Sequence, residues 1–147
     1  MATTVLILPQ RQTVLVAKQV AQLAVLSNNR FRLGIGVGWN KIEYEGLNET
    51  FENRGRRQEE QVMVMRDLWT QDSLDFEGEF HRIDKASINP RPEKSIPIWF
   101  GGSAPALIER VARLGDGWMP LMGANEKAAE CIGKIREARE REGKSMD

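Results

Sequence analysis

Short apolar runs bounded by glycine, proline or asparagine recur along the chain. They are rich in Val, Leu, Ile and Phe, and their length and borders are typical of buried β-strands. We expect four such strands, at Thr4–Leu8, Phe31–Val37, Ile96–Phe100 and Gly117–Met119.

Longer segments with helical periodicity separate these runs. In the clearest one, Asn53–Thr70, the apolar residues Val62, Met65 and Leu68 recur at three-residue steps while most charged residues fall elsewhere. Ser103 is a good N-cap residue, Pro105 fits the first turn that follows it, and Gly115 fits a helix end. The predicted helices are Thr13–Leu26, Asn53–Thr70, the segment between Ser103 and Gly115, and Ala124–Glu142.

The remaining segments predict smaller features. Lys41–Leu47 fits either one helical turn or a loop. Leu74–Phe76 and Phe80–Ile83 flank a glycine, Gly78, in the manner of a small β-hairpin. Ala86–Ser95 contains two prolines, which predict an extended connection.

Strands that alternate with helices predict an α/β fold with a parallel sheet. The right-handed crossovers favour four strands side by side in chain order, with helices on one face. Such a sheet is either a small open sheet or part of a (β/α)₈ TIM barrel. A complete barrel takes about 250 residues, so this chain of 147 residues is too short to close one alone.

Composition and charge exclude several classes of protein. Lys plus Arg and Asp plus Glu are 21 each, which argues against nucleic-acid binding through bulk positive charge. Apolar residues make up 41% and charged residues 29%, as in an ordinary globular protein. No apolar run approaches the roughly 18 residues of a membrane span, and the first residues lack a signal-peptide pattern. We therefore expect a soluble, cytoplasmic protein.

Cys131 and His81 are the single cysteine and the single histidine of the chain. They exclude an internal disulfide, a thiolate zinc cluster and a multi-histidine metal site within one chain, so no metal is expected. We interpret His81 as a surface or packing histidine, and Cys131 as a small buried hydrophobe.

Two glycine-rich strand ends are the main candidates for chemistry. In Gly34-Ile35-Gly36-Val37-Gly38, the glycines would let a planar ligand or a phosphate approach the backbone. The spacing is not that of a Rossmann fingerprint, and glycines that admit neighbouring side chains of a barrel are an equal alternative. Gly101-Gly102-Ser103, at a strand-to-helix junction, fits either an anion site or plain helix capping.

Two further groups carry weaker signals. Asp116, between two glycines, fits a ribityl hydroxyl or a loop amide as its partner, or simply a turn. The cluster Arg54-Gly55-Arg56-Arg57 fits an acidic cofactor tail or a solvated helix start.

Several segments, taken together and in order, carry a resemblance that none carries alone. They are Leu8-Pro9-Gln10-Arg11, Leu15–Gln19, Arg32–Trp39, Arg54-Gly55-Arg56-Arg57, Leu68-Trp69-Thr70, Phe76–Phe80, Pro97–Ser103 and Arg113–Trp118. From about Val5 to Pro120 the chain resembles the luciferase-like monooxygenase family, closest to the branch that includes deazaflavin-dependent oxidoreductases.

The resemblance implies a (β/α)₈ barrel that binds FMN or the deazaflavin coenzyme F420 at the carboxyl ends of its strands. It implies that Gly36, Val37 and Gly38 lie near the ring or ribityl part of this cofactor. By the same resemblance, Gly101, Gly102 and Ser103 help to hold the phosphate. The implied reaction is hydride transfer or oxygen insertion on an organic substrate, and no residue is identified as its acid or base.

The length departs from the family pattern. Residues 1–147 resemble one incomplete barrel domain, from about the third to the sixth strand, which suggests a fragment or a partial gene product. A truncated, non-catalytic remnant that binds a cofactor or a partner is therefore the rival hypothesis. Because an incomplete barrel has open sheet edges, we also expect a homodimer.

Overall fold

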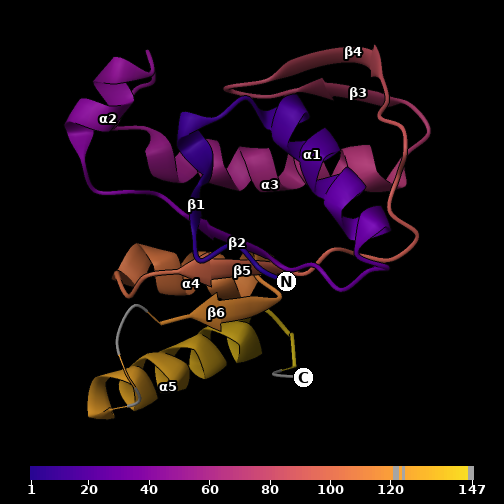
Figure 1. The fold of residues 1–147 in the computed structure, drawn as a ribbon. Coiled ribbons are helices and arrows are strands. Elements are labelled where there is room, and N and C mark those ends of the chain that lie inside the picture. The colour runs from indigo at the N-terminus through magenta and orange to yellow at the C-terminus, as the bar shows by residue number, and fades with distance from the viewer. Residues whose placement is uncertain (121–122, 124, 146–147) are drawn as a thin grey trace.

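The computed structural model describes residues 1–120, 123 and 125–145 (Figure 1). The strands are β1 (Leu6–Ile7), β2 (Leu33–Gly36), β3 (Leu74–Glu77), β4 (Arg82–Ala86), β5 (Ile98–Gly101) and β6 (Gly117–Met119). The helices are the 3₁₀ helix η1 (Leu8–Gln10), α1 (Thr13–Leu26), α2 (Lys41–Gly46), α3 (Arg54–Thr70), α4 (Pro105–Leu114) and α5 (Glu126–Arg141). None of these helices is long and apolar enough to cross a membrane.

The main sheet confirms the predicted order and the α/β class. Its four strands run in the order β1-β2-β5-β6, and every neighbouring pair is parallel. Ile35 of β2 pairs with Leu6 of β1 on one side and with Phe100 of β5 on the other. β1 is shorter than predicted, because the chain turns into η1 at Leu8 and Pro9.

Helices α1, α3, α4 and α5 pack on one face of the sheet, as predicted. α1 packs on α3, α3 contacts α4, and α4 packs on α5. Alternate residues of the central strands enter the same core as the inner faces of these helices, namely Leu33, Ile35, Ile98, Phe100, Val16, Val20, Met65, Leu68, Leu107 and Val111. The intervening residues of β2 are glycines that face the N-terminal segment instead. A Cβ atom at Gly34 would lie 2.1 Å from the carbonyl oxygen of Thr3.

The β3–β4 hairpin extends from the C-terminal end of α3. Phe76 pairs with Ile83 in antiparallel register, and the Gly78 N–H donates to the His81 carbonyl at 2.9 Å. Gly78 therefore opens the turn, as predicted. Figure 1 shows the hairpin beyond α1 and α3, away from β6 and α5.

Two helix starts differ from the sequence prediction. Ala104, not Ser103, occupies the N-cap position of α4, because the chain is still extended at Ala104 (ψ 146°) after a turn at Gly102 (φ +127°). α5 begins at Glu126, where the Asn125 side chain accepts from the Ala128 N–H. Its predicted start, Ala124, lies outside the described residues.

The ambiguous segment Lys41–Leu47 is a helix, α2, over most of its length. The Asn40 side chain accepts from the Ile42 N–H at 3.2 Å and caps the first turn. Tyr44, fully buried beneath this turn, ties it to the protein.

Candidate functional site

The carboxyl ends of β2 and β5 bring the two predicted glycine groups together. The pairing of Ile35 with Phe100 sets Gly36 and Gly101 side by side at the same edge of the sheet. Ligands of parallel α/β sheets bind at this edge. The two segments of the predicted cofactor site are therefore neighbours, although nearly 65 residues separate them in the chain.

Gly36 and Gly101 are closely covered by a side chain of the protein itself. A Cβ atom at Gly36 would lie 2.8 Å from Val5 Cγ2, and one at Gly101 would lie 2.7 Å from Val5 Cγ1. Such contacts exclude any side chain larger than hydrogen unless Val5 moves. At Gly36 this contact is the one expected of a glycine that admits a neighbouring side chain, and Gly101 makes the same kind of contact with Val5.

Val37 and Gly38 form a firmly held turn beyond β2. Gly38 has φ +68°, a backbone conformation that favours glycine. The Tyr44 hydroxyl donates to the Val37 carbonyl at 2.5 Å. Burial raises the pKa of Tyr44 to about 12, although the positive charges of Arg54 and Arg57 act in the opposite direction. Tyr44 therefore stays protonated and keeps this hydrogen bond at neutral pH.

Gly102 and Ser103 form the corresponding turn beyond β5. The Gly102 N–H donates to the Met119 carbonyl at 3.3 Å, and the Gly102 carbonyl accepts from Trp118 Nε1 at 2.7 Å. Within the described part of the chain, the N–H groups of Ser103 and Ala104 and the Ser103 hydroxyl have no hydrogen-bond partner. These donors stand at the start of α4, a ten-residue helix, where the helix dipole favours an anion.

Asp116 lies away from this edge. Its Oδ2 atom accepts from the Ile98 N–H at 2.9 Å and from Arg66 Nη2 at 2.7 Å. Because Ile98 is the first residue of β5, Asp116 acts at the amino ends of the strands. Of the alternatives for this residue, holding a backbone amide is the one that the structure contains.

The arginine cluster at the start of α3 is occupied by protein partners. Arg54 donates to the Phe51 carbonyl and lies over the Phe51 ring at 3.7 Å. Arg57 pairs with Glu49 at 2.6 Å. Arg56 pairs with Glu79 at the hairpin. These side chains hold the segment before α3 and the hairpin tip, which is a different role from binding an acidic tail.

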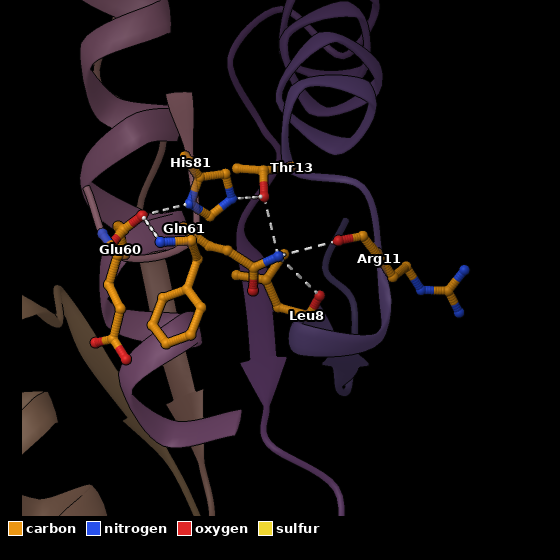
Figure 2. Close-up of polar contacts among 8 residues, drawn as sticks. Leu8, Arg11, Thr13, Glu60, Gln61 and His81 are labelled. Atoms are coloured by element: carbon orange, nitrogen blue, oxygen red, sulfur yellow. Dashed lines mark hydrogen bonds and ion pairs between the residues drawn. The ribbon is translucent and has the colours of Figure 1, made fainter. Parts of the chain in front are cut away.

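A buried polar network near the start of α1 was not predicted from the sequence. His81 lies between two partners, with its Nδ1 atom 2.8 Å from Glu60 Oε1 and its Nε2 atom 2.5 Å from Thr13 Oγ1 (Figure 2). Gln61 Nε2 donates to the same Thr13 oxygen at 3.0 Å and to the carbonyls of Leu8 and Arg11. His81 is therefore not a surface residue: only 11% of its side chain is exposed.

Glu60 is the charged centre of this network. Besides His81, its carboxylate accepts from the backbone N–H groups of Glu79 and Phe80, each at 2.8 Å. Burial alone would raise the pKa of this carboxyl group, but the hydrogen bonds from His81, Phe80 and Glu79 outweigh it and hold the pKa below its usual value. A carboxylate acts only as an acceptor, so His81 Nδ1 carries a proton, and in the neutral imidazole Nε2 accepts from Thr13.

Glu60, His81 and Thr13 are arranged like a catalytic triad, with Thr13 in the position of the nucleophile. The surroundings of Thr13 do not fit that role. Thr13 is buried, and its oxygen already accepts from Gln61. The network joins the hairpin tip to α1, α3 and η1, and this makes it a structural clamp. His81 is 21 residues from Glu60 and 68 residues from Thr13 in the chain, and no spacing pattern in the sequence connects these three residues.

Comparison with known proteins agrees with the geometry. The sequence profile of the luciferase-like monooxygenase family matches residues 1–147. The chain belongs to this family. An uncharacterised protein of Mycobacterium tuberculosis is 40% identical over 141 residues, which are 96% of this chain and 49% of that protein. This luciferase-like chain thus spans about half the length of the curated relatives it matches.

Relatives with named activities use two cofactors. An F420-dependent glucose-6-phosphate dehydrogenase of Mycolicibacterium gilvum is 36% identical over 138 residues, covering 90% of this chain and 41% of the enzyme. An FMNH₂-dependent dimethylsulfone monooxygenase of Pseudomonas fluorescens is 36% identical over 108 residues, covering 71% and 30%. The structure of an F420-dependent secondary alcohol dehydrogenase with an F420–acetone adduct matches with a TM-score of 0.85 and 26% identity, over 98% of this chain and 45% of that one. The luciferase-like chain therefore has the fold of part of a (β/α)₈ barrel.

Proposed function

We propose that this chain contributes the third to sixth strands, as one incomplete barrel domain over residues 1–147, to an oxidoreductase that uses FMN or coenzyme F420. The observation that carries the proposal is the set of unpaired donors at the start of α4. Ser103 and Ala104 offer two backbone N–H groups and a hydroxyl beside a glycine turn. Both cofactors carry a phosphate, which is the kind of group that such a helix start binds.

The residues present fit this cofactor class in part. Ser103 and Ala104 would hold the phosphate beside the Gly102 turn, while Val37 and Gly38 would line the ring or ribityl part. Gly36 and Gly101 would shape the site indirectly, because Val5 covers them. The bound cofactor supplies hydride transfer or oxygen activation toward an organic substrate. The chain's own residues bind and orient it, and we assign no acid or base.

The test compares FMN with riboflavin, which lacks the phosphate, by equilibrium dialysis against the 147-residue chain. We expect FMN to bind more tightly than riboflavin. Ser103→Ala should weaken FMN about tenfold, as for one hydrogen bond to a charged group, and should leave riboflavin unchanged. Ser95→Ala is the matched control, because Ser95 is exposed and precedes the amino end of β5, at the other end of the strand from Ser103. F420 is titrated in the same way.

Equal affinities for FMN and riboflavin, or a Ser103→Ala variant that binds FMN like the wild type, would contradict the phosphate site. Binding of neither FMN nor F420 would favour the second candidate, a non-catalytic module that binds a partner. The contact of Val5 with Gly36 and Gly101 is the observation that favours this second candidate, because it fills space at the candidate site.

We also propose that the chain is cytoplasmic and forms a homodimer. Within the described residues, the outer edges of β1 and β6 have no paired strand. Several apolar side chains on α1 are exposed, namely Val14, Leu15, Leu23, Val25 and Leu26. Unpaired strand edges and exposed apolar surface both favour association.

A further inference from the structure

Four cationic side chains surround a hollow at the C-terminal end of α4. They are Arg66 of α3, Arg113 of α4, Arg139 of α5 and Lys144. The hollow has a volume of about 330 Å³, which lies in the size range of small-ligand sites. Within the described part of the chain, Asp116 is the single acidic residue that lines it. Because the whole chain has no formal net charge, the hollow is a local concentration of positive charge.

Three of these cations are positioned by backbone carbonyl groups at the end of α4. Arg66 Nη2 donates to the Leu114 carbonyl at 3.0 Å, and Arg139 Nη1 donates to the carbonyl of the next residue at 3.1 Å. Lys144 Nζ donates to the carbonyl of Arg113. A carbonyl group carries no net charge, so it fixes the place of a cation without cancelling its charge. The cations therefore come from three parts of the chain and converge on one helix end.

Two carboxylates offset only part of this positive charge. Asp116 Oδ2 accepts from Arg66 at 2.7 Å. Glu59 is shared between Arg110, at 2.8 Å, and Arg113, at 2.9 Å, so it neutralises only one of them. The dipole of α4 adds the equivalent of about half a negative charge at its C-terminal end. Capping of the helix therefore accounts for a small part of the positive charge, and an excess of roughly two charges remains for a ligand.

We propose that this hollow binds the phosphate group of a small phosphorylated compound. Guanidinium groups present their N–H donors in a fork that matches phosphate oxygens. A phosphate monoester carries about two negative charges at neutral pH, which matches the excess positive charge better than a single carboxylate does. The inference is independent of the proposed function, because the hollow lies at the other end of β5. Asp116 in its lining holds the N–H of Ile98, the first residue of that strand, whereas Ser103 follows the last.

The experiment measures the dissociation constant of inorganic pyrophosphate for the 147-residue chain by equilibrium dialysis. Arg113→Gln and Lys144→Gln should each weaken binding about fivefold to tenfold, through loss of one hydrogen bond from a charged donor. Lys144→Arg keeps the positive charge and should bind like the wild type. Lys127→Gln is the matched control, since Lys127 is exposed in the first turn of α5, at the other end of that helix from Arg139. Circular dichroism melts verify that all variants fold.

Ser103→Ala separates this hollow from the candidate cofactor site, and we expect it to bind pyrophosphate like the wild type. An unchanged affinity in both Arg113→Gln and Lys144→Gln overturns the inference, and a loss confined to Ser103→Ala places the anion at the start of α4 instead. An equal loss in Lys127→Gln overturns it in favour of general attraction to positive charge. Failure of the wild-type chain to bind pyrophosphate at millimolar concentration also overturns it, and the proposed function keeps its own test with FMN and riboflavin.

Discussion

The carboxylate of Glu60 is the hydrogen-bond acceptor for three donors at the hairpin tip. Its two carboxylate oxygens receive His81 and two backbone N–H groups at the hairpin tip. A Cβ atom on Gly78 would lie 2.6 Å from the same carboxyl group, so the turn and the carboxylate are fitted to each other. The hairpin therefore depends on a charge carried by α3.

Glu60→Gln should destabilise the protein by about 1–3 kcal/mol, because an amide cannot accept from all three donors. The pKa of Glu60 is lowered in the folded protein. Its stabilising contribution is therefore complete above the unfolded pKa of about 4.3 and is lost as the pH falls through the folded value. Urea unfolding between pH 7 and pH 3 measures both effects.

Glu77→Gln is the control for this prediction, since Glu77 is exposed on the same hairpin. It should unfold like the wild type at pH 7. An identical acid dependence in Glu60→Gln and the wild type would show that the Glu60 carboxylate does not stabilise the fold.

Tyr44→Phe should cost about 1 kcal/mol of stability at neutral pH, through loss of the hydrogen bond to Val37. The raised pKa, about 12, predicts the alkaline behaviour. Wild-type stability falls as the pH rises from the unfolded pKa of about 10 toward the folded value, because the unfolded state releases its proton first. The variant lacks this part of the decline. Urea unfolding at pH 9 and pH 11 tests the difference, and equal declines would contradict it.

At the scale of elements, the glycine before α4 and the glycine within α5 have opposite effects on stability. Gly102, just before α4, has φ +127° and lies close to Leu107, whereas Gly133, within α5, has open space around it. The first glycine is required by the backbone. The second lowers helix stability and is required by nothing within the described residues.

Gly102→Val should therefore destabilise the protein by about 1–3 kcal/mol, because a β-branched residue is strained at positive φ. Gly133→Ala should stabilise it by about 0.5–1 kcal/mol through helix propensity. Thermal melts of both variants show whether each substitution raises or lowers the stability of the protein. A neutral Gly102→Val would contradict the strained turn, and a destabilising Gly133→Ala would contradict the open surroundings of α5.

The order of the elements could be predicted, because alternating strands and helices leave few ways to connect a parallel sheet. The exact start of α4 could not be predicted. The positive φ of Gly102 delays the helix by one residue, and the residues that favour an N-cap do not reveal this dihedral angle. From the sequence, His81 is either a surface or a packing histidine, and its partners could not be identified, because Glu60 and Thr13 meet it only through tertiary packing. The two glycine motifs were predicted at strand ends and lie at one edge of the sheet, but no pattern in the sequence indicates that Val5 covers two of the glycines.

At the scale of the whole molecule, the unpaired edges of the sheet are the basis of the proposed association. A complete barrel has no edges, whereas here β1 and β6 each have an unpaired side within the described residues. Apolar burial contributes roughly 25 cal/mol per Å², so an interface of about 800 Å² per partner provides a substantial driving force.

We therefore expect the 147-residue chain to sediment as a dimer or larger species at low micromolar concentration. Leu15→Glu and Leu26→Glu on the exposed face of α1 distinguish association through that helix from association through strand edges, because only the former is weakened by added charge. A monomer that unfolds cooperatively and binds no apolar dye would contradict the prediction.

The contact between Val5 and the two glycines also makes position 5 a useful place for redesign. Its two γ-carbons fill the space above Gly36 and Gly101, so volume removed at Val5 becomes volume at the carboxyl edge of β2 and β5. Val5→Ala would remove some packing contacts and leave more space for a ligand, without changing either glycine. Enlarging the side chain to isoleucine would have the opposite effect. One position would then tune the size of ligand that the luciferase-like scaffold admits, independently of the residues that we propose for phosphate binding.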